Sequence, residues 1–429
     1  MKVYIQTLGC KVNQYETQAM ETLLSQRGHT ISLTEEGCDV FIINTCAVTA
    51  ESGRKSRQTI RRLKTNNPDA VIAVCGCYSQ VSPDDIESLD ADLIGGSADR
   101  KVFLEDLEKV YTEKQKIRKL DEALKRRKFE VLPAGKMPGR TRAMLKIEDG
   151  CDNFCSYCII PYARGPVRSM EPEAIEAEAK RLSDEGFAEI IVTGIEIASY
   201  GKDLKRGIGL TEIIEMICKA APSSRIRLGS LEPRVITESF CQKLSSLGNV
   251  CPHFHLSLQS GCDETLKRMR RKYDTARFYE SVELLNKYFP GCALTADLIT
   301  GFPGETEEEF SKTLAFIEKC AFSQMHIFPY SRREGTVADK MEGQIERKVK
   351  QERASRAAKI ADRMKDDFLQ SCVGTVQPVL FEQEKDGLYY GHSANYCEVC
   401  AKGENLKSRL LKVQIKGTKN GVLLGEIIL

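Results

Sequence analysis

Apolar strand segments alternate with amphipathic helix segments along the first 100 residues, and this order restricts the fold more than any other feature of the chain. Strand patterns cover 3–8, 40–45 and 70–74, and helical patterns cover 13–26 and 53–64. Strands that are separated by helices pair in parallel, with right-handed crossovers. We therefore predict an N-terminal α/β domain built on a parallel sheet.

A second series of strands and helices begins near residue 141. Its predicted strands are 143–148, 189–194, 225–230, 253–258, 293–300 and 325–330. Its predicted helices lie near 173–186, 210–220, 236–247, 275–289 and 306–320. Six strand–helix units are fewer than the eight that close a barrel. We therefore predict a partial, open (βα)6 barrel whose site lies at the carboxyl ends of its strands.

The tail changes to short alternating segments with Gly, Asn and Asp turns, which predict a small antiparallel β-barrel. The fold class is thus α/β with a C-terminal β-barrel, and the predicted domains are 1–112, 113–140, 141–368 and 369–429. The second of these is predicted to be a basic helix and linker, because eight of residues 114–128 are basic and two are acidic. Such a run is often a solvated helix face, but the basic segment at 53–64 favours an RNA-facing surface.

The chain has 17 cysteines among 429 residues, and it begins with a strand pattern rather than a charged leader and an apolar core. These features favour metal ligands and free thiols over disulfides. Cys397 and Cys400 have a spacing that suits a metal or a disulfide, but no second pair lies nearby, which favours a structural role. No apolar run approaches the about 20 residues that span a bilayer, so we expect a soluble cytoplasmic protein. The net charge of +2 does not by itself indicate a nucleic-acid partner.

One cysteine follows each of the first three predicted strands: Cys10, Cys46 and Cys77. The carboxyl ends of parallel strands share one edge of a sheet, where ligands bind. The three thiols are therefore expected to converge and to hold an iron–sulfur cluster with one open iron. We choose Cys77 over Cys75 as the third ligand, because Cys75 continues its strand and Cys77 lies past a glycine. Ordinary buried free cysteines are the alternative.

A second triad, Cys151, Cys155 and Cys158, has the spacing C-x3-C-x2-C. Three thiolates can hold three irons of a cubane cluster and leave the fourth iron free to bind a small chelating cofactor. A zinc site with a distant fourth ligand, or three ordinary buried thiols, are the alternatives.

Polar residues and glycines follow the strands of the second series in an order that suits a nucleoside cofactor. A glycine lets the cofactor approach the backbone, and a carboxylate accepts from an ammonium group. The candidates at the strand ends are Thr193, Gly194, Glu196, Ser230, Glu232, Ser257, Gln259, Asp297, Ile299 and Phe328.

The second triad, with Tyr157 before its last cysteine, resembles the signature of the radical S-adenosylmethionine superfamily. The strand-end residues match the cofactor-binding pattern of that barrel, and Tyr157 joins them as a cofactor contact. The whole chain resembles the methylthiotransferases, which combine a three-cysteine cluster domain, a radical S-adenosylmethionine barrel and an RNA-binding TRAM domain. The segment from Thr7 to Thr17 and the run from Cys158 to Ser169 look most like the branch that acts on threonylcarbamoyladenosine. The isopentenyladenosine branch typically reads Gly-Cys-Gln-Met-Asn where this chain reads Gly-Cys-Lys-Val-Asn, and the branch acting on a ribosomal-protein aspartate typically reads Gly-Cys-Pro-Lys-Asn.

The resemblance implies two 4Fe–4S clusters and two molecules of S-adenosylmethionine. One supplies a methyl group to a sulfur at the N-terminal cluster, and the other is cleaved at the barrel cluster to a radical that takes the hydrogen from C2 of the adenine. All six triad cysteines are then catalytic as well as metal ligands. The alternatives within the family are isopentenyladenosine or a ribosomal-protein aspartate as the substrate. A non-catalytic metal-binding RNA module is the alternative outside it.

The expected partners are the anticodon stem-loop of tRNA and an electron-donor protein such as flavodoxin or ferredoxin, with the enzyme a monomer. The target base must leave its stack to reach the barrel. Arg164, Arg168, Arg332 and Arg333 are expected to flank the barrel mouth and to bind anticodon-loop phosphates or the carboxylate of the threonyl group. Ordinary surface arginines are the alternative.

Overall fold

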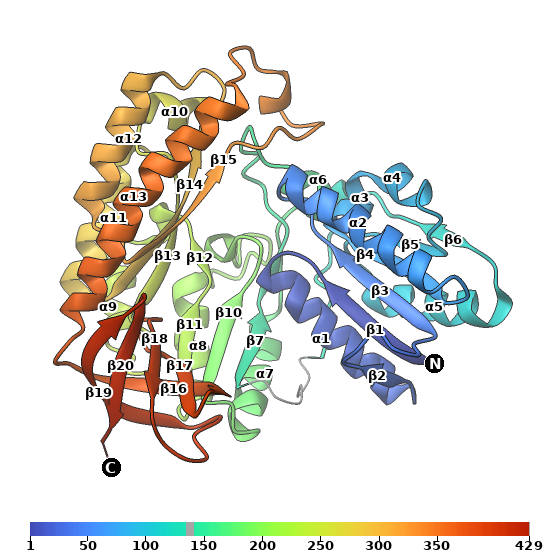
Figure 1. Ribbon diagram of the computed structural model, residues 1–429, viewed down its shortest axis with the longest axis horizontal. Coiled ribbons are helices and arrows are strands. Elements are labelled where there is room, and N and C mark those ends of the chain that lie inside the picture. Colours follow the sequence, from blue (N-terminus) through green and yellow to red (C-terminus); the bar gives the residue numbers. More distant parts are fainter. Residues whose placement is uncertain (134–140, 429) are drawn as a thin grey trace.

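The computed structural model of the protein describes residues 1–133 and 141–428. Figure 1 shows an N-terminal α/β unit beside the open side of a central pair of sheets, with a C-terminal β-barrel at one end of those sheets. The arrowheads of the central strands point away from the C-terminal barrel. None of the helices in the described ranges is long and apolar enough to cross a membrane.

The N-terminal sheet has six parallel strands in the order β2-β1-β3-β4-β5-β6. Its strands are β1 (Lys2–Thr7), β2 (Thr30–Ser32), β3 (Val40–Thr45), β4 (Val71–Gly76), β5 (Leu93–Gly95) and β6 (Ile117–Lys119). Its helices are α1 (Lys11–Gln26), α2 (Ala50–Asn66), α3 (Cys77–Val81), α4 (Pro83–Glu87) and α5 (Arg100–Glu113). Successive side chains of β3 fill separate cores on the two faces of the sheet, as the strand period of two requires. The three predicted strands and two predicted helices are confirmed.

The basic helix predicted over 114–128 is wrong. The segment instead adds β6 to the edge of the sheet and then forms the 3-10 turn η1 (Ala123–Lys125). Its charges pair with acidic side chains already fixed on the sheet's loops and helices, so that Lys116 binds Asp90 and Lys119 binds Asp106. These pairs and the packing of Ile117 favour the strand over a helix. Residues 134–140 of the predicted linker lie outside the described residues.

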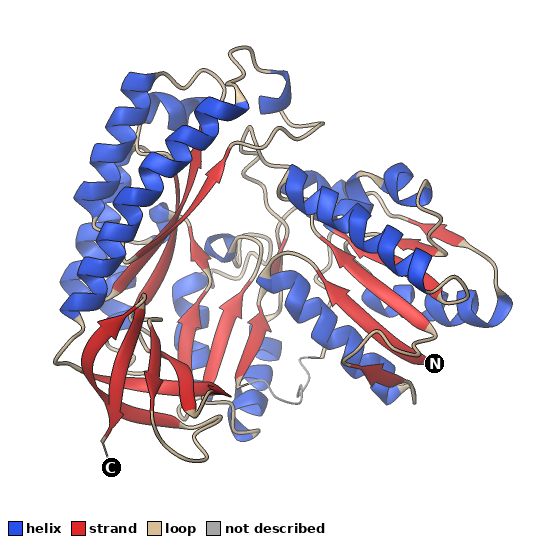
Figure 2. Ribbon diagram, viewed as in Figure 1, coloured by secondary structure: helices blue, strands red, loops and turns tan. Residues whose placement is uncertain are grey.

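Two parallel sheets make up the central domain, as predicted for an open barrel (Figure 2). The strands are β7 (Arg142–Lys146), β10 (Glu189–Thr193), β11 (Arg225–Leu228), β12 (Ser230–Leu231), β13 (His253–Gln259), β14 (Ala293–Thr300) and β15 (Gln324–Pro329). The large helices are α7 (Pro172–Asp184), α8 (Leu210–Ala220), α9 (Glu238–Ser245), α11 (Thr275–Tyr288), α12 (Glu307–Cys320) and α13 (Arg347–Ser371). Shorter elements are β8 (Glu148–Asp149), α6 (Ile160–Arg164), β9 (Arg168–Ser169) and α10 (Asp263–Arg268). The predicted strand at 225–230 is divided at Gly229 into β11 and β12, which belong to different sheets.

The C-terminal strands close into a barrel in the order β16-β17-β18-β20-β19. They are β16 (Val376–Lys385), β17 (Leu388–Ser393), β18 (Glu398–Ala401), β19 (Leu410–Lys419) and β20 (Val422–Ile427). The prediction of a small barrel is confirmed, but it is not wholly antiparallel, because β18 and β20 pair in parallel. Cys397 and Cys400 are both buried within this unit, which agrees with a structural role for each.

Buried arginines of β11 attach the C-terminal barrel to the starts of the central strands. Arg225 donates to the carbonyls of Pro378 and His392 at 2.9 Å, and Arg227 donates to the carbonyl of Ala394 at 2.9 Å. Both guanidiniums also bind the carboxylate of Glu189, which has no exposed surface. Burial raises the pKa of Glu189, but Arg227, Arg225 and Arg142 outweigh that effect and hold it at about 2.

Glu189→Gln is expected to lower the free energy of unfolding by about 3 kcal/mol at neutral pH, because it leaves buried arginines without their carboxylate. The pKa of a glutamate is about 4.3 in the unfolded chain. The stabilisation by Glu189 is therefore complete above about pH 4.3 and is lost as the pH falls toward 2. Urea unfolding of both proteins at several pH values measures the difference, which should shrink in that window. A difference independent of pH would contradict this role. Glu238→Gln, which removes an exposed partner of Lys287, is the matched control and should change stability little.

Candidate active site

The cysteines of the first triad meet at the carboxyl edge of the N-terminal sheet. Cys10 follows β1, Cys46 follows β3 and Cys77 begins α3. The loops that carry them are packed closely: a Cβ at Gly9 would lie 2.6 Å from Cβ and 2.8 Å from Sγ of Cys46. Gly9 also has a φ of +107°, which favours glycine. Each of the three thiols lies within electrostatic reach of another member of the triad.

The side chains of Cys75 and Cys77 lie in different environments. Cys75 is fully buried in the apolar core on the α5 side of the sheet, with Val3 and Leu104. Cys77 lies past the end of β4, and its Sγ accepts a hydrogen bond from Nε of Arg164 at 3.1 Å. Burial raises the pKa of Cys75 to about 11, although Arg100 lowers it. This arrangement favours Cys77 as the third ligand.

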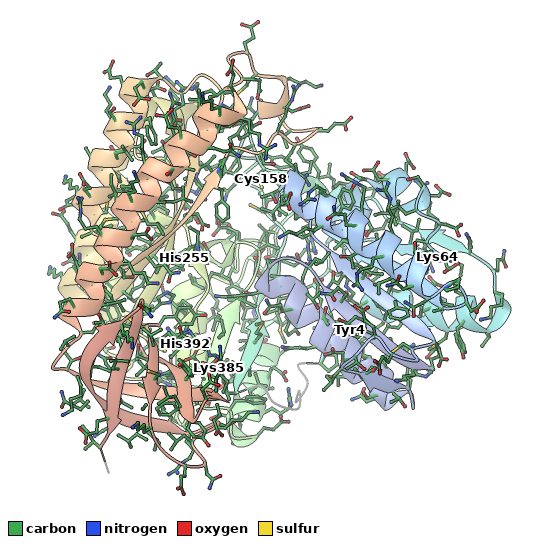
Figure 3. The ribbon with its side chains drawn as sticks, in the orientation of Figure 1. Tyr4, Lys64, Cys158, His255, Lys385 and His392 are labelled. Atoms are coloured by element: carbon green, nitrogen blue, oxygen red, sulfur yellow. The ribbon has the colours of Figure 1, made fainter. Side chains whose placement is uncertain are left out.

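The second triad lies on the loop between β8 and α6, at the carboxyl end of the central strands. Sγ of Cys155 accepts a hydrogen bond from Nη1 of Arg271 at 3.1 Å. The thiols of Cys151 and Cys158 lie within electrostatic reach of Cys155. Cys158 also lies within electrostatic reach of Cys77, so the two triads are neighbours across the boundary between the domains. Figure 3 shows Cys158 beside the N-terminal unit.

The donor set fits two iron–sulfur clusters. Within residues 1–133 and 141–428, no group of three or more His, Cys, Asp or Glu is compact enough to hold a single metal ion. A cubane cluster spreads its thiolates over separate irons, so its ligands stand farther apart than those of one ion. Each triad also has an arginine that donates to one sulfur: Arg164, which is buried, and Arg271, which is half-buried. A cationic donor of this kind stabilises the negative charge of a thiolate-bound cluster.

Five of the predicted cofactor residues line one cavity of about 170 Å³. They come from the loop of the second triad and from β13, β14 and β15: Tyr157, Gln259, Asp297, Ile299 and Phe328. Val48 and Thr49, which follow Cys46, line the same cavity. The space next to the barrel triad therefore opens directly onto the loop of the N-terminal triad.

The other predicted cofactor residues end β10, β12 and β13 and do not line this cavity. Ser230 and Ser257 share a hydrogen bond of 3.0 Å between their hydroxyls. Burial raises the pKa of Glu196 to about 7, and Glu232 contributes to the rise. Glu196 lies within electrostatic reach of Cys151. A Cβ at Gly194 would lie 2.8 Å from Oε2 of Glu148, so the backbone turns closely there. Thr193, the last residue of β10, is buried.

Two of the predicted RNA-binding arginines are buried, and their assignment to phosphates is wrong. Arg164 has no exposed surface and binds Glu16, Asn13 and Cys77. Arg168 is 3% exposed, donates to backbone carbonyls and pairs with Asp149. Their donors face the protein interior, so an RNA phosphate cannot reach them.

The remaining two arginines do lie at the surface near the mouth. The side chain of Arg332 is 63% exposed and pairs with Asp339. Arg333 donates to the carbonyl of Ala47 and lines a hollow of about 500 Å³ with Arg57, Tyr78 and Tyr162. Their role in RNA binding stays a prediction.

The buried ion network around Glu16 was missed from the sequence. Its carboxylate accepts from Arg164, from Arg100 at 2.9 Å and from Lys146 at 3.1 Å. Burial raises the pKa of Glu16, but Arg164, Lys146 and Arg100 hold it well below its usual range. The available signal was the helical spacing of Asn13, Glu16 and Thr17, which places polar groups on one face of α1. Arg271 and Tyr273, which contact the barrel triad and the carbonyl of Ser257, were also missed.

Comparison with known proteins divides the chain as the structure does. Residues 145–317 match the radical SAM superfamily, and residues 2–96 match a family described as uncharacterized protein family UPF0004. Threonylcarbamoyladenosine tRNA methylthiotransferase MtaB of Bacillus subtilis is 40% identical over 96% of this chain and 93% of its own length. The Aquifex aeolicus protein of the same name is 33% identical over 97% of this chain and 100% of its own length. The tRNA-2-methylthio-N(6)-dimethylallyladenosine synthase of Symbiobacterium thermophilum is 33% identical over 100% of this chain and 94% of its own length.

Among solved structures, the radical S-adenosylmethionine methyltransferase TsrM from Kitasatospora setae is similar in fold. It has a TM-score of 0.56 and 14% identity, over 91% of this chain and 80% of that chain. At this identity the likeness concerns the arrangement of the chain alone.

Arg164→Met is expected to lower the free energy of unfolding of the cluster-free protein by about 3–5 kcal/mol, because it leaves buried Glu16 without its main cationic partner. Arg332→Met, at the exposed pair, should have a much smaller effect. Urea unfolding measures both. Equal, small effects of the two substitutions would mean that Arg164 is an ordinary surface arginine after all.

Proposed function

Because the chain belongs to the methylthiotransferase family of radical S-adenosylmethionine enzymes, we propose that it attaches a methylthio group to C2 of threonylcarbamoyladenosine next to the anticodon of tRNA. The observation that carries this proposal is the meeting of two cysteine triads at one cavity between two domains. A radical enzyme with one cluster needs only one triad. A second triad on the facing domain supplies a place for the sulfur.

The residues divide the task between the two domains. Cys151, Cys155 and Cys158 would hold the cluster that binds S-adenosylmethionine, and Cys10, Cys46 and Cys77 would hold the other. When bound, these groups supply the electron, the radical that removes the hydrogen from C2, and the sulfur. The chain itself positions the base and excludes water from the cavity. Arg271 and Arg164 fix one sulfur of each triad by a direct hydrogen bond.

The substrate follows from the relatives and from the chain's own signature. The Bacillus subtilis relative named for threonylcarbamoyladenosine is 40% identical, against 34% for the relative from the same organism named for dimethylallyladenosine. The similarity to the second group makes isopentenyl-type adenosine the second candidate.

The partners are inferred from the same family. We propose that the C-terminal barrel is a TRAM-type RNA-binding module and that Arg332, Arg333 and the basic face of α2 contact the anticodon stem-loop. A flavodoxin or ferredoxin would supply the electron, and the enzyme would act as a cytoplasmic monomer.

Loss of the gene is expected to remove the methylthio form of threonylcarbamoyladenosine from cellular tRNA. Threonylcarbamoyladenosine without the methylthio group should remain in its place. Liquid chromatography with mass spectrometry of tRNA nucleosides measures both. Persistence of the methylthio nucleoside would contradict the proposal. Loss of the isopentenyl-type methylthio nucleoside instead would favour the second candidate.

Cys155→Ala and Cys46→Ala are each expected to reduce the iron content from about eight to about four per chain, because each removes one ligand of one cluster. Cys155→Ala should abolish cleavage of S-adenosylmethionine. Cys46→Ala should keep some cleavage and lose methylthiolation. Anaerobic reconstitution with iron, sulfide and product analysis measures these effects. Cys241→Ala, which removes a buried thiol on α9, is the control and should keep both clusters. Zinc without labile sulfide in the wild type would favour the non-catalytic module.

A further inference from the structure

Exposed aromatic side chains gather around the candidate active site. The chain has 16 phenylalanines and 14 tyrosines, all within the described ranges, and only Phe154, Tyr162 and Phe328 are exposed. Phe154 lies between two cysteines of the second triad, and Tyr162 lies on α6, directly after that triad. Phe328 lines the cavity of about 170 Å³. The exposed rings of this chain are therefore confined to the surroundings of one site.

Phe154 and Tyr162 form a single aromatic surface. Their ring centres lie 5.6 Å apart, and the ring planes are inclined by 81°, which is an edge-to-face arrangement. Each side chain is 39% exposed. An edge-to-face contact covers one face of one ring, so aromatic faces stay free for a further partner. Single exposed apolar residues are ordinary on a protein surface, but two paired rings beside a site indicate a ligand with a flat aromatic face.

The hollow of about 500 Å³ that Tyr162 lines adjoins the smaller cavity of about 170 Å³. Tyr157 lines the cavity, and Ile159 lines the hollow. In the same way, Ser331 lines the cavity and Arg333 lines the hollow. Residues two apart in a chain lie at most about 7 Å from each other. The two spaces are therefore close enough to receive neighbouring parts of one ligand.

Arg333 gives the hollow a cation without an acidic partner. Its side chain is half-buried, and within the described residues it donates to the carbonyl of Ala47 and pairs with no carboxylate. Arg57, which also lines the hollow, is different because it lies 3.7 Å from a carboxylate oxygen of Asp85. Glu334 lines the hollow too, but it is exposed to solvent. A guanidinium has five N–H donors, so Arg333 keeps donors free for an oxyanion such as a phosphate.

The proposed reaction creates a need for such a surface. The target adenine must leave the base stack of the anticodon loop to reach the cavity. The neighbouring base then loses a stacking partner. Aromatic side chains commonly take the place of a lost base in RNA-binding proteins, and any of the four bases can stack on them. A ring pair next to the cavity, with a cationic donor in the same hollow, suits a neighbouring nucleotide better than it suits a cofactor.

We propose that the hollow binds the nucleotide next to the target adenosine, with its base stacked on the Phe154–Tyr162 pair and its phosphate bound by Arg333. The inference rests on the proposed function and deepens it, because it adds a second recognised nucleotide to the substrate. Stacking tolerates any base, so the presence of the neighbouring base should matter more than its identity.

The test measures binding of synthetic anticodon stem-loops to the full-length, anaerobically reconstituted enzyme by fluorescence anisotropy. Three RNAs have threonylcarbamoyladenosine at the target position: one is intact, and the others lack the base on its 5′ or its 3′ side. For the wild type, we expect one abasic RNA to have a dissociation constant about 10-fold higher, because one stacked base is lost. Tyr162→Ala should bind the intact RNA about 10-fold more weakly and no longer distinguish it from that abasic RNA. Tyr162→Phe, which keeps the ring, should resemble the wild type.

Arg333→Met tests the phosphate contact separately. It should reduce the slope of the logarithm of the affinity against the logarithm of the salt concentration by about 0.7, as for one phosphate of a single strand. It should still distinguish the abasic RNA. Leu33→Ala, which removes an 83% exposed apolar side chain just after β2, is the matched control and should change neither quantity. An iron content of about eight per chain in each variant shows that both clusters are intact.

Two results would overturn the proposal. One is a wild type that binds both abasic RNAs as tightly as the intact RNA, a comparison that needs no variant. The other is a Tyr162→Ala variant that keeps the wild-type ratio, as expected if this surface receives an electron-donor protein instead of RNA. Failure of the proposed function is distinguishable, because the wild type would then form no methylthio product from the intact RNA. The ratios of dissociation constants still decide the role of the hollow in that case.

Discussion

A guanidinium without exposed surface lies between the two halves of the site, and the relative position of the two cysteine triads depends on it. Arg164 is the last residue of α6, the short helix that follows the barrel triad. It binds Glu16 and Asn13 of α1 and Sγ of Cys77. The removal of such an ion from water costs several kcal/mol, which only a complete set of partners offsets. The domains therefore cannot slide apart without leaving a buried charge unpaired. One side chain links the ligand of one cluster to the loop of the other.

The meeting of the N-terminal cysteines could be predicted because it follows from the strand topology alone. A parallel sheet brings its strand ends to one edge, so Cys10, Cys46 and Cys77 converge whatever the details of packing. Arg164 and Arg168 could not be placed in this way, because an arginine near a predicted mouth looks the same in a sequence whether it faces RNA or a buried glutamate. The basic segment at 114–128 failed for a related reason: the acids that pair with it, such as Asp90 and Asp106, come from distant parts of the chain.

The C-terminal barrel is held to the central domain by polar contacts that complete the shells of buried arginines. Its backbone carbonyls accept hydrogen bonds from the arginines of β11, and the ring of Tyr396 packs 4.7 Å from the guanidinium of Arg227.

Gly9 has a further consequence. Its contact with Cys46 leaves no room for even a methyl group, so the cysteine loops are in place as part of the folded sheet. In many small metalloproteins the metal organises the chain, and the free energy of binding is spent on folding. Here the packing of the chain contributes to the spacing of two cysteine loops, so a larger residue at position 9 would displace Cys46 from Cys10.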